Sequence, residues 1–202
     1  MAAISVEVSK HRPSLVPERP LMTHLLTVSG SPSATSRGNA LAHLVGAQLA
    51  AEGHQVDHLS VRDLPAEALL HAGFGNAEIR ASQEAVDRAD GLVIVTPVYK
   101  ASFSGALKAW LDLLPQTALE GKTVLPLATS GSLAHALALD YALRPVLQAL
   151  GARHVVQSHL VTDTQLTVGP DGSVRLHESA VHRLDATLDA FVDALPYART
   201  TV

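Results

Sequence analysis

The stretch GSPSATSRGNAL, residues 30–41, is rich in groups that can hold an anion, and it lies between a short apolar run and a helical pattern. Ser31, Ser36 and Asn39 can donate hydrogen bonds, and Arg37 adds one positive charge. The stretch has neither the GxGxxG spacing of a dinucleotide loop nor the lysine of the triphosphate loop GxxxxGK[ST]. At a helix N-terminus these groups suit one terminal phosphate of a monoester. The alternative interpretation is a helix cap in a polar turn.

A second candidate is TPVYKASFSGALKAWLD, residues 96–112, which follows another apolar run. The segment from Pro97 to Ser104, with Tyr99 inside it, is stiff and partly apolar, so it could lie along the edge of a flat ring. Ser104 is a good N-cap for a helix that begins directly after it. The alternative is an ordinary strand-to-helix loop, with Trp110 in the core or at a subunit interface.

The third candidate is ATSGSLAH, residues 128–135, which also follows an apolar run. Around Thr129, Ser130 and Gly131, small side chains and free backbone N–H groups could receive the polar edge of a heterocycle. His135 could approach the same edge, although a surface position on a helix is the alternative for this side chain.

Short apolar runs rich in β-branched residues alternate with longer amphipathic segments along the chain. We predict strands over residues 25–29, 56–60, 91–96, 123–129 and 154–161. We predict helices over residues 38–52, 76–89, 105–114, 134–150 and 178–195. Strands that are apolar almost throughout and separated by helices indicate a parallel sheet covered on both faces.

This alternation predicts an α/β fold, a flavodoxin-like three-layer, doubly wound parallel sheet of five strands in the order 2-1-3-4-5. The turn chemistry of GPDG, residues 169–172, predicts a small β-hairpin before the last helix. Ligands of such sheets bind at the carboxyl ends of the strands, where the three candidate loops begin.

The length of 202 residues fits one domain, which we place at residues 23–197. Residues 1–22 contain charges and prolines but no apolar segment typical of a signal peptide, so we expect a disordered extension. Met22 directly precedes the first predicted strand and is a plausible alternative start.

The composition excludes several classes of function. A net charge of −4 argues against a general nucleic-acid binder, and no apolar run approaches the length of a membrane span. The absence of cysteine excludes disulfides, thiolate zinc sites and cysteine nucleophiles, and it fits the reducing cytoplasm. HESAVH, residues 177–182, is not a HExxH zinc motif, because its histidines are five apart and lie about 140° apart around a helix. We therefore expect no metal site.

Taken together, GSPSATSRGNAL, ADGLVIVTPVYKASFSGALKAWLDLLP, LEGKTVLPLATSGSLAH and LDYALRPVLQALGA resemble the NAD(P)H-dependent FMN reductase family, closest to its alkanesulfonate-system, two-component branch. The resemblance implies an FMN phosphate held by Ser31, Ser36, Arg37 and Asn39, although the family often has serine at the last position. It implies a flavin ring lined by Pro97, Val98, Tyr99 and Ser104, with Thr129, Ser130 and Gly131 facing its pyrimidine edge.

Tyr141 occupies the position that distinguishes this branch. Pro145, four residues later in a helical pattern, has no N–H to donate to the carbonyl of Tyr141, so the residues alone predict a helix irregularity there. The resemblance implies a π-helical turn at a tetramer interface, with FMN behaving as a substrate. The alternative is a simply buried tyrosine.

The resemblance thus implies an enzyme that transfers a hydride from NADPH or NADH to FMN, needs no catalytic acid or base, and supplies reduced flavin to a flavin-dependent monooxygenase of sulfonate or sulfur assimilation. We expect a homodimer or homotetramer. One alternative is a stand-alone quinone or azo reductase with bound FMN. Another is a flavodoxin-like electron carrier, which the modest charge and scarce aromatics disfavour.

Overall fold

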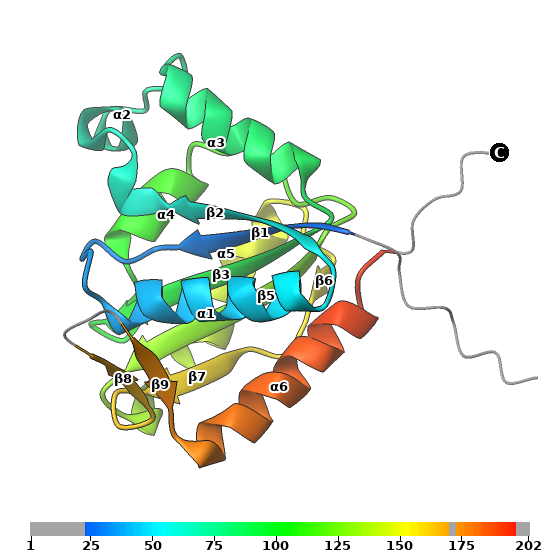
Figure 1. Cartoon of the computed structure of the whole chain (residues 1–202). Coiled ribbons are helices and arrows are strands. Elements are labelled where there is room, and N and C mark those ends of the chain that lie inside the picture. Colours follow the sequence, from blue (N-terminus) through cyan, green and yellow to red (C-terminus); the bar gives the residue numbers. More distant parts are fainter. Residues whose placement is uncertain (1–22, 170–172, 197–202) are drawn as a thin grey trace, which may run out of the picture.

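A mostly parallel β-sheet forms the centre of the computed structural model, which describes residues 23–169 and 173–196 (Figure 1). Its parallel strands are β1 (His24–Ser29), β2 (Gln55–Ser60), β3 (Gly91–Tyr99), β5 (Thr123–Ser130), β6 (His154–Val155) and β7 (His159–Thr162). The strand order is β2-β1-β3-β5-β6, and β7 also pairs with β5. Since β6 and β7 together replace the fifth predicted run, the predicted order 2-1-3-4-5 is confirmed.

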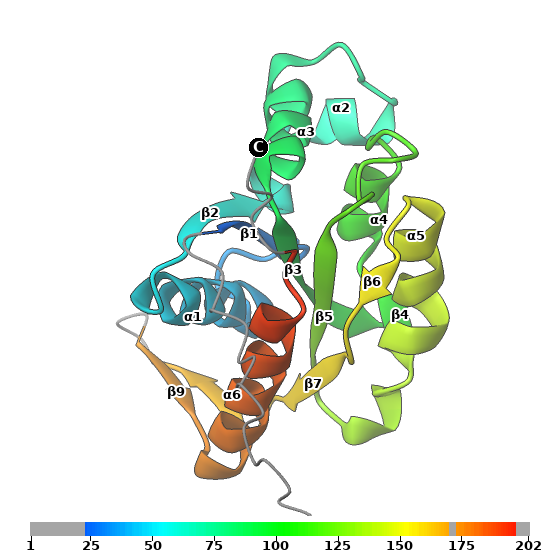
Figure 2. The ribbon, with the colours of Figure 1, turned by 90° about the vertical axis from the view of Figure 1, so that its right-hand side faces the viewer.

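Helices cover both faces of the sheet (Figure 2). One face carries α1 (Arg37–Ala51) and α6 (Glu178–Asp193), and the other carries α3 (Ala77–Arg88), α4 (Gly105–Leu111) and α5 (Arg144–Ala149). The short α2 (Ala66–Leu70) and the 3₁₀ turn Val61–Asp63 follow β2 and were not predicted. Such short elements do not display the helical period in a sequence.

The two faces are packed by alternate residues of the same strands. In β3, Leu92 faces one apolar cluster, with α3, α4 and α5, whereas Val93 faces the other, with α1 and α6. Trp110 on α4 is fully buried in the first cluster and donates its indole N–H to the hydroxyl of Ser82, 3.1 Å away. Trp110 is therefore a core residue rather than part of a subunit interface.

The fifth predicted run, residues 154–161, is not one strand. Ladder pairing stops after β6 and resumes at β7, so three residues between them lie outside the ladder. The guanidinium of Arg144 donates to the carbonyls of Val155 and Val156, at 2.8 and 3.1 Å, and to Asp140. Asp140 in turn accepts from the hydroxyl of Ser158. A continuous strand is wrong here because the register shifts by one residue between Val124↔Val155 and Leu127↔His159, opposite Pro126, which has no N–H to donate to the edge strand.

The predicted helix over 134–150 is irregular, as Pro145 led us to expect. It consists of a 3₁₀ turn (Leu133–His135), a π-helical turn (Leu139–Leu143) and α5. The N–H of Arg144 bonds to the carbonyl of Leu139, five residues earlier, which is the π spacing. Tyr141 lies in this turn with 78% of its surface exposed, so the alternative of a buried tyrosine is wrong for the protomer.

The predicted hairpin is present as β8 (Leu166–Val168) and β9 (Val174–Leu176), paired antiparallel, while its turn at 170–172 lies outside the described residues. An unpredicted strand, β4 (Ser102–Phe103), folds back on the end of β3 through Lys100 and Ala101, which both have positive φ. The extension over 1–22 also lies outside the described residues. No helix in the described ranges is long and apolar enough to cross a membrane.

Candidate functional site

The three candidate loops begin side by side because their strands are neighbours in the sheet. Ser29 at the end of β1 is paired with Val95 of β3, and Pro97 of β3 is paired with Thr129 of β5. The N–H of Gly30 bonds to the carbonyl of Val95 at 2.8 Å, so the first loop leaves the sheet against the third strand. The parallel register therefore places all three loops at one edge of the sheet.

Gly38, in the first turn of α1, lies where the three loops meet. A Cβ built there would lie 3.5 Å from Thr129 Oγ1, 3.8 Å from Ser36 Oγ and 3.9 Å from Pro97 Cδ. One side-chain position thus touches a residue of each loop. Gly38 is buried, so it marks the point where the three loops approach one another.

In the first loop, the hydroxyls of Ser31 and Ser36 each accept a different backbone N–H group. Ser31 is fully buried, and its Oγ accepts the N–H of Ser33 at 3.2 Å. Ser36 is the N-cap of α1 and accepts the N–H of Asn39 at 3.0 Å. The Oδ1 atom of Asn39 is buried without a hydrogen-bond partner within the described residues, so this amide is not committed to the protein. The capping role of Ser36 therefore does not prevent the same loop from binding an anion.

Arg37 reaches from the same loop towards the segment after β7. Its Nε donates to the carbonyl of Leu166 at 3.1 Å, and its Nη1 lies 3.6 Å from Oδ2 of Asp163. Asp163 follows β7 and is fixed by its own N–H, which bonds to the carbonyl of Ser130 at 2.9 Å. Asp163 was not among the residues predicted from the sequence, although its place directly after the fifth strand, at the ligand-binding edge, was a usable signal.

In the second loop, Ser104 holds the loop together. Its hydroxyl accepts the N–H of Leu107 at 3.1 Å and donates to the carbonyl of Gly30, and its own N–H bonds to Thr96 Oγ1 at 3.0 Å. The Ser104 side chain is buried, and its O–H donor is committed to the carbonyl of Gly30. Tyr99, by contrast, is about half exposed at the rim of the site.

The third loop is small and tightly bonded. Thr129 and Ser130 are largely buried, and Ser130 Oγ accepts the N–H of Ser132 at 3.4 Å. A Cβ at Gly131 would lie 3.8 Å from Oδ2 of Asp163, so this loop faces the segment that contacts Arg37. His135 lies exposed in the following 3₁₀ turn, which agrees with the surface alternative.

Comparison with known proteins identifies the family. The profile of NADPH-dependent FMN reductases matches residues 23–167. The chain belongs to this family. It is 46% identical over 172 residues to an FMN reductase (NADPH) of Pseudomonas putida, a match that covers 85% of this chain and 87% of that protein. It is 41% identical over 171 residues to an FMN reductase (NADPH) of Escherichia coli, covering 85% and 89%.

A solved structure of the same reaction class is similar throughout. The apo crystal structure of the NADH:FMN oxidoreductase EMOB matches with a TM-score of 0.80 and 42% identity, covering 89% of this chain and 94% of that one. By family, the reaction of the chain is reduction of FMN by a reduced nicotinamide. The comparison includes relatives described with NADPH and others described with NADH.

Two cavities of this FMN reductase adjoin the first and third loops, and no residue of the second loop lines either of them. The first, about 680 Å³, lies between the start of α1 and the hairpin, and the second, about 610 Å³, lies beside the third loop. The first is lined by Ala34, Thr35, Ser36, Asn39, Ala40, His43, Val168, Gly169 and Val174. The second is lined by Gly131, Ser132, Leu133, Thr162, Thr164, Gln165, His177 and Ser179. Residues of the predicted phosphate and pyrimidine regions thus open onto free space.

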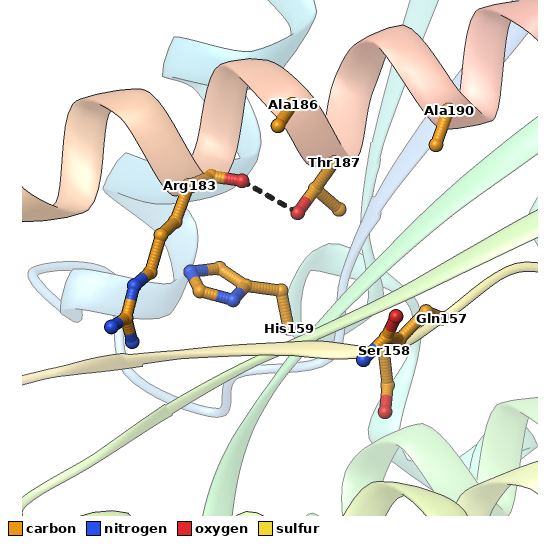
Figure 3. A pocket seen from close by; sticks show the side chains of 7 residues that line it. All are labelled: Gln157, Ser158, His159, Arg183, Ala186, Thr187 and Ala190. Carbon is orange, nitrogen blue, oxygen red and sulfur yellow. Dashed lines mark hydrogen bonds between the residues drawn. The ribbon is translucent and has the colours of Figure 1, made fainter.

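A third cavity of about 380 Å³ lies between α6 and the split edge strand, and no predicted site residue lines it (Figure 3). His159 points into it from β7, beside Arg183 of α6. Burial lowers the pKa of His159, and the charge of Arg183 lowers it further. Among the described residues, no group of three or more histidine, aspartate or glutamate side chains could hold a metal ion.

Proposed function

We propose that the chain holds FMN where its three loops meet, reduces it with NADPH or NADH, and releases the reduced flavin to a flavin-dependent monooxygenase of sulfur or sulfonate assimilation. The observation that carries this proposal is the junction at Gly38, where a single Cβ would touch Ser36, Pro97 and Thr129. A phosphate, a sugar chain and a ring edge require three different chemical environments, and these loops supply them side by side.

The first loop fits the phosphate. Ser31, Ser36 and Asn39 bring hydroxyl and amide groups to the start of α1, where free backbone N–H groups and the helix dipole favour an anion. The buried, unpartnered amide oxygen of Asn39 supports a role for this side chain, because turning the amide would present its N–H₂ group instead. Arg37 supplies the positive charge.

The second and third loops fit the ring. Pro97, Val98 and Tyr99 offer a partly apolar wall, and Ser104 fixes that wall to the first loop through Gly30. Thr129, Ser130 and Gly131 would face the polar pyrimidine edge with backbone groups and small side chains. Ser104 would then act on the flavin through loop position rather than through its hydroxyl, which other groups occupy.

When bound, FMN supplies a ring nitrogen that accepts the hydride, so the protein supplies placement and electrostatics. The residues of the three loops hold one ring so that the nicotinamide can stack on it at about 3–3.5 Å. No acid or base has to move a proton during this transfer. The cradle contains one arginine and few aromatic side chains, which favours exchange of FMN over permanent retention.

We also propose that the π-helical turn contributes to an interface between copies of the chain, in a homodimer or homotetramer. Leu133, Leu137 and Tyr141 are four residues apart and 60%, 60% and 78% exposed. Exposed large apolar side chains that gather in one segment are a feature of interaction surfaces. It follows directly on the third loop, so assembly at this surface would bear on flavin release.

The decisive experiment is anaerobic oxidation of NADPH and NADH by the full chain with free FMN, FAD or riboflavin. We expect turnover with FMN to exceed turnover with riboflavin, because only FMN carries the phosphate. Arg37→Gln should raise the KM for FMN and leave that for riboflavin unchanged. Equal rates with both flavins would rule out the phosphate cradle. Stoichiometric FMN that survives extensive dialysis, with ping-pong reduction of quinones, would favour a stand-alone quinone reductase.

A further inference from the structure

The segment after β7 brings a carboxylate to the proposed phosphate cradle. We propose that Asp163 sets how weakly the cradle holds FMN, because its negative charge offsets that of Arg37 and opposes the phosphate. This inference rests on the proposed FMN site. Oδ2 of Asp163 lies 3.6 Å from Nη1 of Arg37, and the two side chains are 43% and 47% exposed.

Asp163 is not needed to position Arg37. A separation of 3.6 Å is too long for a hydrogen bond, and ion pairs between half-exposed groups hold side chains only weakly. The Nε atom of Arg37 makes a proper hydrogen bond of 3.1 Å to the carbonyl of Leu166. Arg37 would therefore keep its place if the charge of Asp163 were removed, and the effect of Asp163 on a bound anion is electrostatic.

Asp163 is itself held firmly where it acts. Its N–H bonds to the carbonyl of Ser130 at 2.9 Å, and the N–H of Gln165 closes the loop onto the carbonyl of Thr162 at 2.9 Å. The side chain of Gln165 also accepts the N–H of Thr162 at 3.0 Å. The Oδ2 atom of Asp163 would lie 3.8 Å from a Cβ at Gly131, so the carboxylate faces the third loop as well as solvent.

Arg37 is the one cationic residue in the stretch 30–41. Arg62 also reaches this loop, donating to the carbonyl of Pro32 at 3.3 Å, but it is paired with its neighbour Asp63 at 3.1 Å. A phosphate dianion placed against Arg37 meets a guanidinium that already faces a carboxylate. Binding then relies on neutral hydroxyl and N–H donors, which give geometry and selectivity without strong attraction. This arrangement suits a flavin that must leave after reduction.

The test compares the wild-type full chain with Asp163→Asn, using quenching of flavin fluorescence to measure the Kd of oxidised FMN and riboflavin. We expect Asp163→Asn to bind FMN about three- to tenfold more tightly at low ionic strength, with a smaller gain at high salt. The Kd of riboflavin should not change, since it carries no phosphate. Asp163→Ser, which also removes the charge, should reproduce the gain if the asparagine variant folds poorly.

The control is Asp193→Asn, which changes the net charge equally. Asp193 is exposed at the end of α6, next to Leu195, which packs against Gly91 at the opposite edge of the sheet. Its replacement should leave both Kd values unchanged. Unchanged or weaker FMN binding by the Asp163 variants, or an equal gain for riboflavin, would overturn the inference. Equal affinity of the wild type for FMN and riboflavin would instead overturn the phosphate cradle itself.

Discussion

The hydroxyl of Ser104 donates a hydrogen bond to the carbonyl oxygen of Gly30, 74 residues earlier in the chain. The same hydroxyl caps α4 by accepting the N–H of Leu107. One buried side chain thus fixes the second loop against the first and begins the helix behind them. The relative position of the proposed phosphate and ring regions depends on this contact.

Ser104→Ala should lower the free energy of unfolding by about 1–3 kcal/mol, because it removes a cap and leaves a buried carbonyl without its donor. It should also raise the KM for FMN, since the two loops lose their connection. Urea unfolding and steady-state kinetics measure these effects. Ser132→Ala, which removes an exposed cap of a 3₁₀ turn, should cost much less stability. Equal costs for both variants would contradict the special role of Ser104.

Ser36→Ala should weaken both α1 and FMN binding. Loss of the N-cap should cost about 1 kcal/mol of stability. Loss of a hydroxyl donor to the phosphate should raise the KM for FMN by about tenfold. Asn76→Ala removes the corresponding N-cap of α3, outside the three loops, and should match the stability loss without any change in KM. A similar KM effect in both variants would mean that helix stability alone is responsible.

Gly38→Ala should raise the stability of the fold but weaken FMN binding, so that the two effects can be told apart. A Cβ at this position has ordinary contact distances of 3.5–3.9 Å, and alanine is the better helix former, so we expect a gain of about 0.5–1 kcal/mol in stability. The methyl group would fill the junction of the three loops and raise the KM for FMN. Thermal unfolding and kinetics test this. A more stable variant with unaltered KM would place the flavin elsewhere.

Tyr141→Ala should leave the protomer stable within about 0.5 kcal/mol, because the side chain is 78% exposed. If the π-helical turn lies in an interface, the variant should shift the assembly towards smaller species and change how much FMN is retained after dialysis. Light scattering after size exclusion measures the mass. Leu70→Ala, at an equally exposed leucine on α2, is the control and should leave the mass unchanged.

His58 should make the fold sensitive to mild acid. Its ring stacks on His43 with centroids 3.8 Å apart and bonds to Thr27. The pKa of His58 is lowered to about 4, first by burial and then by the charge of His43, whereas Asp63 opposes the change.

An unfolded histidine titrates near 6.5, so the unfolded state binds this proton first as the pH falls. Stability should therefore be complete above about pH 6.5 and decline towards pH 4. Because the residue is partly exposed, the decline should be modest. His58→Gln should reduce this pH dependence of stability, as measured by urea unfolding across the same range. Part of the dependence should remain in the variant, because the pKa of His159 is also lowered. An unchanged slope would rule out His58 as a source.

The sequence determined the elements whose signals are local. Apolar runs such as 91–96 and 123–129 marked the buried strands, because a strand covered on both faces must be apolar throughout. Ser104 before its helix and Pro145 inside a helical pattern acted through neighbouring backbone groups, so the cap and the irregular turn were both predictable. The order of alternating strands and helices then predicted the sheet and the edge that carries the loops.

Only the tertiary structure decided which distant groups meet. The contact of Arg37 with Asp163 joins residues that are 126 positions apart, and no local pattern encodes it. At the split of the fifth strand, Arg144 reaches two backbone carbonyls from a helix. The sequence by itself predicted a polar loop, rich in hydroxyl groups, after the first strand. The carboxylate that faces Arg37, and the approach of the three loops at Gly38, arise from packing and strand register, which depend on the whole fold.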